Sequence, residues 1–82
     1  MANEKQQVMK VMGERAASLF GGNPSDYGED TTFESLGIKS VQYSQLTTYL
    51  EDEFDIEVPF MKFRRKKTFG EAADYVVELL DM

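Results

Sequence analysis

The chain has 82 residues, a formal net charge of −6, and neither cysteine nor histidine. Its length fits one domain, 1–82, and so short a chain has a thin core, which favours a packed helical bundle. The two missing residue types exclude a disulfide framework, a thiolate metal site and a Ser-His-Asp arrangement. We therefore expect no metal site and no catalytic residues, and the chain is not predicted to be an enzyme.

The net negative charge of the chain and the absence of long apolar runs indicate which partners and which cellular location to expect. Affinity for nucleic acid comes mainly from Lys and Arg side chains that neutralise phosphates, so this chain predicts no nucleic-acid partner. Residues 1–7 are polar and lack the apolar core of a signal peptide. No apolar run approaches the ~20 residues that span a bilayer. We expect a cytoplasmic monomer whose protein partners present basic surfaces.

Helical periodicity starts close to the N-terminus and predicts a first helix that ends at Phe20. Gly21 and Gly22 end this helix, and Pro24 lies just beyond it. The apolar face of the helix comprises Val8, Val11, Met12, Ala16, Leu19 and Phe20.

No period is sustained from Gly21 to Lys39, so this stretch is predicted to be a loop. It is long for a connection in a compact domain, which indicates that it is anchored to the bundle or functional. Phe33, Leu36 and Ile38 are the apolar residues that would anchor it. Thr31–Glu34 has the spacing of a capping box, which predicts a single helical turn there.

A second helix is predicted from about Ser40 to Phe54, and a last helix is predicted to start at a capping box formed by Thr68 and Glu71. Between them, Asp55–Pro59 is expected to be an extended connector, because it has no partner strand and ends in proline. A short helix or turn follows in residues 60–66. The apolar residues of the two long helices are Val41, Leu46, Tyr49, Leu50 and Phe54, then Phe69, Ala72, Ala73, Val76, Leu79 and Leu80. The chain is thus predicted to be all-α, with a long loop between the first two helices.

Ser40 stands where the second helix begins and has two interpretations. A serine just before an apolar-periodic segment is usually an N-cap, which accepts a bond from an exposed backbone N–H. Tyr43, three residues on, is not the Glu or Gln of a capping box, which weakens this interpretation. A helix N-terminus also offers free N–H groups and partial positive charge, so a phosphate ester on Ser40 would lie in a favourable field.

Three stretches of the sequence resemble the acyl carrier proteins and related carrier domains. Phe33–Val41 resembles their modification motif, Leu50–Pro59 resembles the end of their second helix with the following loop, and Thr68 with Ala72–Val76 resembles their last helix. The resemblance covers nearly the whole chain and implies a small antiparallel bundle of three main helices plus a short third helix. The modification motif around Ser40 then comprises Leu36, Gly37, Lys39 and Val41.

The resemblance also implies a function. A phosphopantetheinyl transferase would move 4'-phosphopantetheine from coenzyme A onto the Ser40 hydroxyl. The thiol of that arm would carry an acyl group as a thioester for acyl-transferring or acyl-modifying enzymes, while the protein supplies positioning and recognition. This describes a carrier of a specialised acyl pathway, and fatty acyl, polyketide, aminoacyl and lipid-precursor cargo all remain open.

Lys39 departs from the family's pattern, because carriers of the bacterial fatty-acid type mostly have Asp immediately before the serine. A cation at a helix N-terminus is unfavourable by roughly 0.3–1 kcal/mol, whereas beside an attached phosphate it would neutralise charge. A solvated lysine without a role is an equally weighted interpretation. The alternative function is therefore a non-carrying helical adaptor that kept the fold and lost modification.

Two charged stretches are predicted to recognise partners. One comprises Glu51, Asp52 and Glu53 at the end of the second helix. Anions are electrostatically unfavourable there, which favours recognition over a merely solvated helix end. The other comprises Arg64 and Arg65, within a basic run over residues 62–67 for which nucleic-acid and membrane contacts are weaker alternatives.

An acyl-chain pocket between the helices is a further prediction. It would be lined by Leu46, Ile56, Phe60, Ala73 and Val76. The simpler interpretation is that these five residues are ordinary core, since apolar stripes pack together in any helical bundle.

Overall fold

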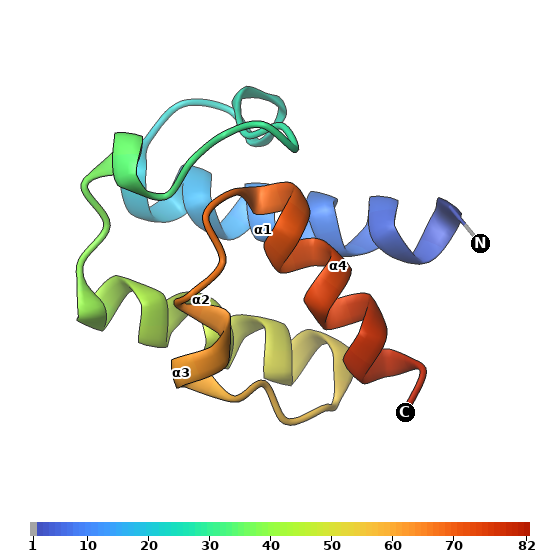
Figure 1. Cartoon of the computed structure of the whole chain (residues 1–82). Helices are drawn as coiled ribbons and strands as arrows, with labels where there is room; N and C mark the ends of the chain where they lie inside the picture. Colours follow the sequence, from blue (N-terminus) through green and yellow to red (C-terminus); the bar gives the residue numbers. More distant parts are fainter. Residues whose placement is uncertain (1) are drawn as a thin grey trace.

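The computed structural model describes residues 2–82, and the side chains of residues 4–82. It is a small helical bundle, as predicted, in which α1 and α2 run in opposite directions and α4 crosses between them (Figure 1). α1 packs against α4 and α2, and α2 packs against α3. The elements are α1 (Ala2–Phe20), α2 (Ser40–Phe54), α3 (Phe60–Phe63) and α4 (Phe69–Leu80), with one-turn 3-10 helices η1 (Pro24–Asp26) and η2 (Glu34–Leu36) in the long connection.

α1 forms because its apolar residues recur one turn apart on the face that meets the bundle. Val8, Met12 and Ala16 are fully buried. Gly13, inside the same helix, lies against η1: a Cβ on Gly13 would come within 2.8 Å of the Pro24 carbonyl oxygen. The connection therefore starts by packing its backbone directly onto α1.

The long connection is anchored, which confirms the prediction. Phe33 is 2% exposed, and Leu36 and Ile38 are half-buried against the core. Backbone hydrogen bonds join the connection to the start of α4: Phe33 N–H to the Lys67 carbonyl (3.0 Å), Phe69 N–H to the Thr31 carbonyl (2.9 Å) and Gly70 N–H to the Glu29 carbonyl (3.0 Å). The predicted helical turn is found as η2, which begins at Glu34, later than expected.

Phe33 stands at the centre of a cluster of aromatic side chains. Its ring centroid lies 4.7 Å from that of Phe69, 5.3 Å from that of Tyr43 and 6.0 Å from that of Phe63. Tyr27 stacks on Phe69 at 5.6 Å. These five residues, the aromatic cluster, tie the connection to α2, α3 and α4, so the segment before α2 is held from three sides.

The start of α4 follows the predicted capping box in part. Thr68 Oγ1 accepts the Glu71 N–H at 3.1 Å, as expected for an N-cap. The Glu71 carboxylate, however, accepts the N–H of Lys67 at 3.2 Å, one residue before the cap. The Glu71 side chain therefore bonds the backbone N–H of Lys67, in the connector between α3 and α4, and not the N–H of the N-cap residue Thr68.

Candidate functional site

A left-handed glycine sets the direction of the chain before α2. Gly37 has φ 62 and ψ 35, a conformation that costs glycine little and other residues more. Its N–H donates to the Glu34 carbonyl at 3.1 Å, which closes η2. Lys39 is then extended, with φ −105 and ψ 164, and α2 begins at the next residue, Ser40. This turn places Ser40 on the surface, as the first residue of α2.

Lys39, and not Ser40, occupies the N-cap position of α2, which corrects the interpretation of Ser40 as the cap. The Gln42 Oε1 atom accepts the Lys39 N–H at 2.8 Å. An ammonium group has no lone pair to accept a bond, so Lys39 supplies no side-chain half of a capping box. Gln42, three residues after Lys39, was the sequence signal that would have placed the cap correctly.

The cap leaves Ser40 free for chemistry. Ser40 is exposed, and within residues 2–82 no hydrogen bond engages its hydroxyl. The N–H groups of Ser40 and Val41 are likewise without partners in that range, whereas Gln42 N–H already donates to the Lys39 carbonyl at 2.9 Å. Two free donors and the positive end of the α2 dipole surround the hydroxyl, which suits an attached phosphate ester.

The acidic residues lie at the other end of α2. Asp52 follows Ser40 by twelve residues, which is about 18 Å along a helix axis. Asp52 and Glu53 are exposed there. Glu51 is half-buried, and its Oε2 atom accepts the Val58 N–H at 2.8 Å, so it holds the loop after α2.

The basic residues flank the start of α2. Arg64 and Arg65 are exposed and line a hollow of about 390 Å³ together with Ile38 and Tyr43, which stand on either side of Ser40 in the sequence. Sequence reasoning placed the basic run on a partner surface and gave no indication that it meets the segment around Ser40.

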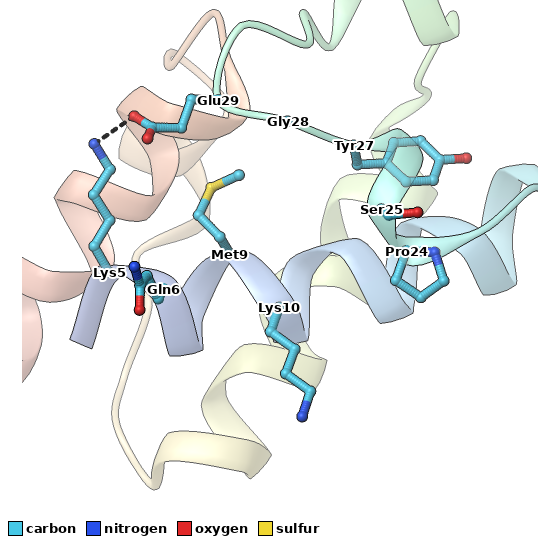
Figure 2. A pocket seen from close by; sticks show the side chains of 9 residues that line it. All are labelled: Lys5, Gln6, Met9, Lys10, Pro24, Ser25, Tyr27, Gly28 and Glu29. Carbon is cyan, nitrogen blue, oxygen red and sulfur yellow. Dashed lines mark ion pairs between the residues drawn. The ribbon is translucent and has the colours of Figure 1, made fainter. Parts of the chain in front are cut away.

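The five residues of the predicted acyl pocket belong to the core and its edge. Leu46, Ala73 and Val76 are buried, and Ile56 and Phe60 are half-buried against the core cluster. A larger hollow, of about 510 Å³, lies elsewhere, between α1 and the long connection (Figure 2). Its walls include Met9 and Lys10 of α1 with Pro24 and Tyr27, and a 2.7 Å ion pair joins Lys5 to Glu29 at its edge. Neither Ser40 nor its motif contributes to it.

Comparisons with known proteins agree with this geometry. The family model described as "Phosphopantetheine attachment site" matches residues 11–76. The chain is 25% identical over 71 residues to the lovastatin diketide synthase MokB of Monascus pilosus, covering 87% of this chain but 3% of that protein's length. In fold it is similar to the crystal structure of an acyl carrier protein from Thermotoga maritima, with a TM-score of 0.77, 23% identity, and coverage of 95% of this chain and 92% of that one.

The chain therefore belongs to the family of carrier proteins with a phosphopantetheine attachment site. Members of this family are carriers rather than enzymes, and their prosthetic group is covalently bound 4'-phosphopantetheine. The free hydroxyl and unpartnered N–H groups at the start of α2 fit the phosphate of that group. Across residues 2–82, no helix is both long and apolar enough to cross a membrane.

Proposed function

We propose that Ser40 is the attachment residue and that the modified protein carries acyl groups for a specialised pathway. The Ser40 hydroxyl loses its proton and forms a bond to the pantetheine-side phosphorus of coenzyme A, while the phosphoanhydride bond breaks and adenosine 3',5'-bisphosphate leaves. The attached thiol then supplies the thioester chemistry. The observation that carries this proposal is the exposed, unpartnered Ser40 hydroxyl beside two free N–H groups of α2.

Three features support a dedicated set of enzymes. Lys39 stands beside the attachment residue with a charge opposite to that of the common Asp. The exposed middle of α2, at Ser44, Gln45 and Thr48, is neutral. The similarity to a segment of a diketide synthase supports a biosynthetic acyl pathway of the polyketide type. We take the carrier to be a cytoplasmic monomer.

Partner recognition is divided between the two ends of α2. Asp52 and Glu53 present negative charge to enzymes with basic surfaces, and Glu51 orders the loop beside them. Arg64 and Arg65 present positive charge near Ser40. Reversing both, Arg64→Glu with Arg65→Glu, should weaken the affinity of the unmodified protein for its cognate enzyme and leave its far-UV circular dichroism unchanged. Equal affinity in a titration would remove this part of the proposal.

Intact mass spectrometry tests the attachment. The protein is co-expressed with several phosphopantetheinyl transferases, and we expect the mass increase of one phosphopantetheinyl group. Ser40→Ala should abolish the increase, whereas Ser44→Ala, which removes an exposed hydroxyl one turn further along α2, should not. Unmodified protein with every transferase would instead support the alternative function, a helical adaptor that is not modified.

A further inference from the structure

A concentration of positive charge faces the hollow beside Ser40. Its walls include four consecutive cationic residues of the α3–α4 connector: Arg64, Arg65, Lys66 and Lys67. One carboxylate, that of Glu34, also lines it. The residues that line the hollow thus have four formal positive charges and one negative charge, on a chain whose net charge is −6.

The four cations form no ion pair within the described side chains, although Lys66 Nζ lies 4.9 Å from the centre of the Tyr75 ring and the Glu71 carboxylate accepts the Lys67 N–H. Among the residues whose side chains are described, the ion pairs join Lys5 to Glu29 at 2.7 Å and to Asp74 at 3.0 Å, and none involves the hollow. Glu34 is exposed and lies outside ion-pair distance of the four. An unpaired cluster of this kind retains its attraction for an external anion.

Tyr43 adds a hydrogen-bond donor to the wall. Only 9% of its surface is exposed, it lines the hollow, and no hydrogen bond within residues 4–82 uses its hydroxyl. Burial raises the pKa of Tyr43, against the opposing charge of Arg64, so the phenol stays protonated at neutral pH. The Arg64 guanidinium carbon lies 5.9 Å from the centre of the Tyr43 ring.

The hollow adjoins the attachment residue. Ile38 precedes Ser40 by two residues, and Tyr43 follows it by three, so Ser40 and Tyr43 are neighbours on the surface of α2. Ser40 does not itself line the hollow, but a flexible arm attached to it starts within three residues of two that do. Thr32, Phe33 and Ile38 also line the hollow; Phe33 is 2% exposed, so the half-buried Ile38 side chain is the apolar surface that suits a short run of methylene groups.

We propose that this hollow binds the free carboxylate of a dicarboxylyl cargo, such as a succinyl group, carried on the arm attached to Ser40. The inference rests on the proposed function. Guanidinium, ammonium and phenol donors together match a carboxylate, and the apolar wall matches the chain behind it. The phosphate of the arm is a different anion, because its bond to Ser40 keeps it at the N–H groups of α2 and at Lys39. The hollow, at about 390 Å³, has room for a larger group.

The cargo's own carboxyl group reports on the hollow. The protein is loaded by a transferase of broad specificity from coenzyme A bearing a succinyl group labelled with ¹³C at its carboxyl carbon, and the carboxyl is titrated by NMR. We expect its pKa to lie about 0.5–1 unit below that of free succinyl-pantetheine, because nearby cations favour the charged form. Arg64→Gln should reverse at least a third of this shift.

Two further variants separate the hollow from general charge effects. Lys62→Gln removes one charge from the same basic run, but Lys62 does not line the hollow, so the shift should persist. Tyr43→Phe keeps every charge and removes the donor, and should reverse part of the shift. The proposal is overturned by a carboxyl pKa equal to that of free succinyl-pantetheine. It is also overturned by a shift that Arg64→Gln and Lys62→Gln reduce equally, which would assign the effect to long-range charge or to the end of α2.

A second route keeps the test independent of enzymatic loading. The chain has no cysteine, so Ser40→Cys creates a single thiol to which a ¹³C-carboxyl chain of similar length can be joined as a disulfide. If mass spectrometry finds no phosphopantetheine on Ser40, the proposed function fails, yet this adduct still reports on the hollow. A shifted pKa in the adduct, sensitive to Arg64→Gln, supports the hollow, and an unshifted one refutes it.

Discussion

Phe33 holds the segment that presents Ser40, and its replacement by leucine isolates that role. Leucine keeps most of the buried apolar surface but removes three ring contacts, to Tyr43, Phe63 and Phe69. Aromatic pairs contribute about 0.5–1.5 kcal/mol each beyond their buried area, so Phe33→Leu should cost about 1.5 kcal/mol or more. A chain of this length has a total stability of about 4–12 kcal/mol, so the loss is a substantial fraction.

Urea denaturation followed by far-UV circular dichroism measures this loss. With a slope of about 1 kcal/mol per molar urea for a small domain, the midpoint should fall by about 1.5 M. Phe54→Leu is the matched control, because Phe54 is half-buried at the far end of α2 and takes no part in the aromatic cluster. Equal midpoint losses in the two variants, or a loss below about 0.5 kcal/mol for Phe33→Leu, would refute the reasoning.

Three other outcomes are expected. Lys39→Asp should raise the rate at which a transferase of fatty-acid synthesis modifies the protein, since it restores the charge common in that class; an unchanged or lower rate in a side-by-side assay contradicts this. Gly13→Ala should lower the free energy of unfolding, measured by urea denaturation, by about 1 kcal/mol. Overlap of the new Cβ with the Pro24 backbone costs about 1–3 kcal/mol, which outweighs a helix-propensity gain of about 1 kcal/mol. A variant more stable than the parent would contradict this and show that η1 shifts at little cost. Hydrogen bonds to Glu29 and Asp74 raise the pKa of Lys5, so their stabilising effect is complete below the ordinary lysine pKa of 10.5 and disappears as pH rises through the higher folded value. The urea midpoint of Lys5→Gln should therefore lie below that of the parent at neutral pH and approach it as the pH rises beyond the ordinary lysine pKa of 10.5. A gap between the two midpoints that does not narrow would argue against the ion pair.

The helices were predictable because their signals are local. Periodic apolar residues placed the three long helices, and Thr68 with Glu71 marked the start of α4. Gly37 could be recognised as a turn residue and has the left-handed conformation that favours glycine. The place of Ser40 at the start of a helix also followed from the sequence, because a turn with Gly37 and the onset of apolar periodicity coincide there.

The features that were missed depend on contacts between distant residues. Gly13 gave a weak signal as a glycine inside a helix, but the partner that approaches it, Pro24, cannot be read from periodicity. Glu51 looked like one of three equivalent surface acids, although its carboxylate accepts the Val58 N–H. The approach of Arg64 to Tyr43 joins segments twenty-one residues apart, so the hollow beside Ser40 had no local signature.

The three backbone hydrogen bonds between the long connection and residues 67–70 can form only after both segments have been synthesised. Residues 29–33 leave the ribosome well before residues 67–70, yet each group needs the other to satisfy its backbone. Until residues 67–70 have been synthesised, the connection before α2 lacks these three backbone hydrogen bonds. If Ser40 carries the arm, as proposed, an enzyme that recognises the finished surface can load it only after residues 67–70 have been synthesised.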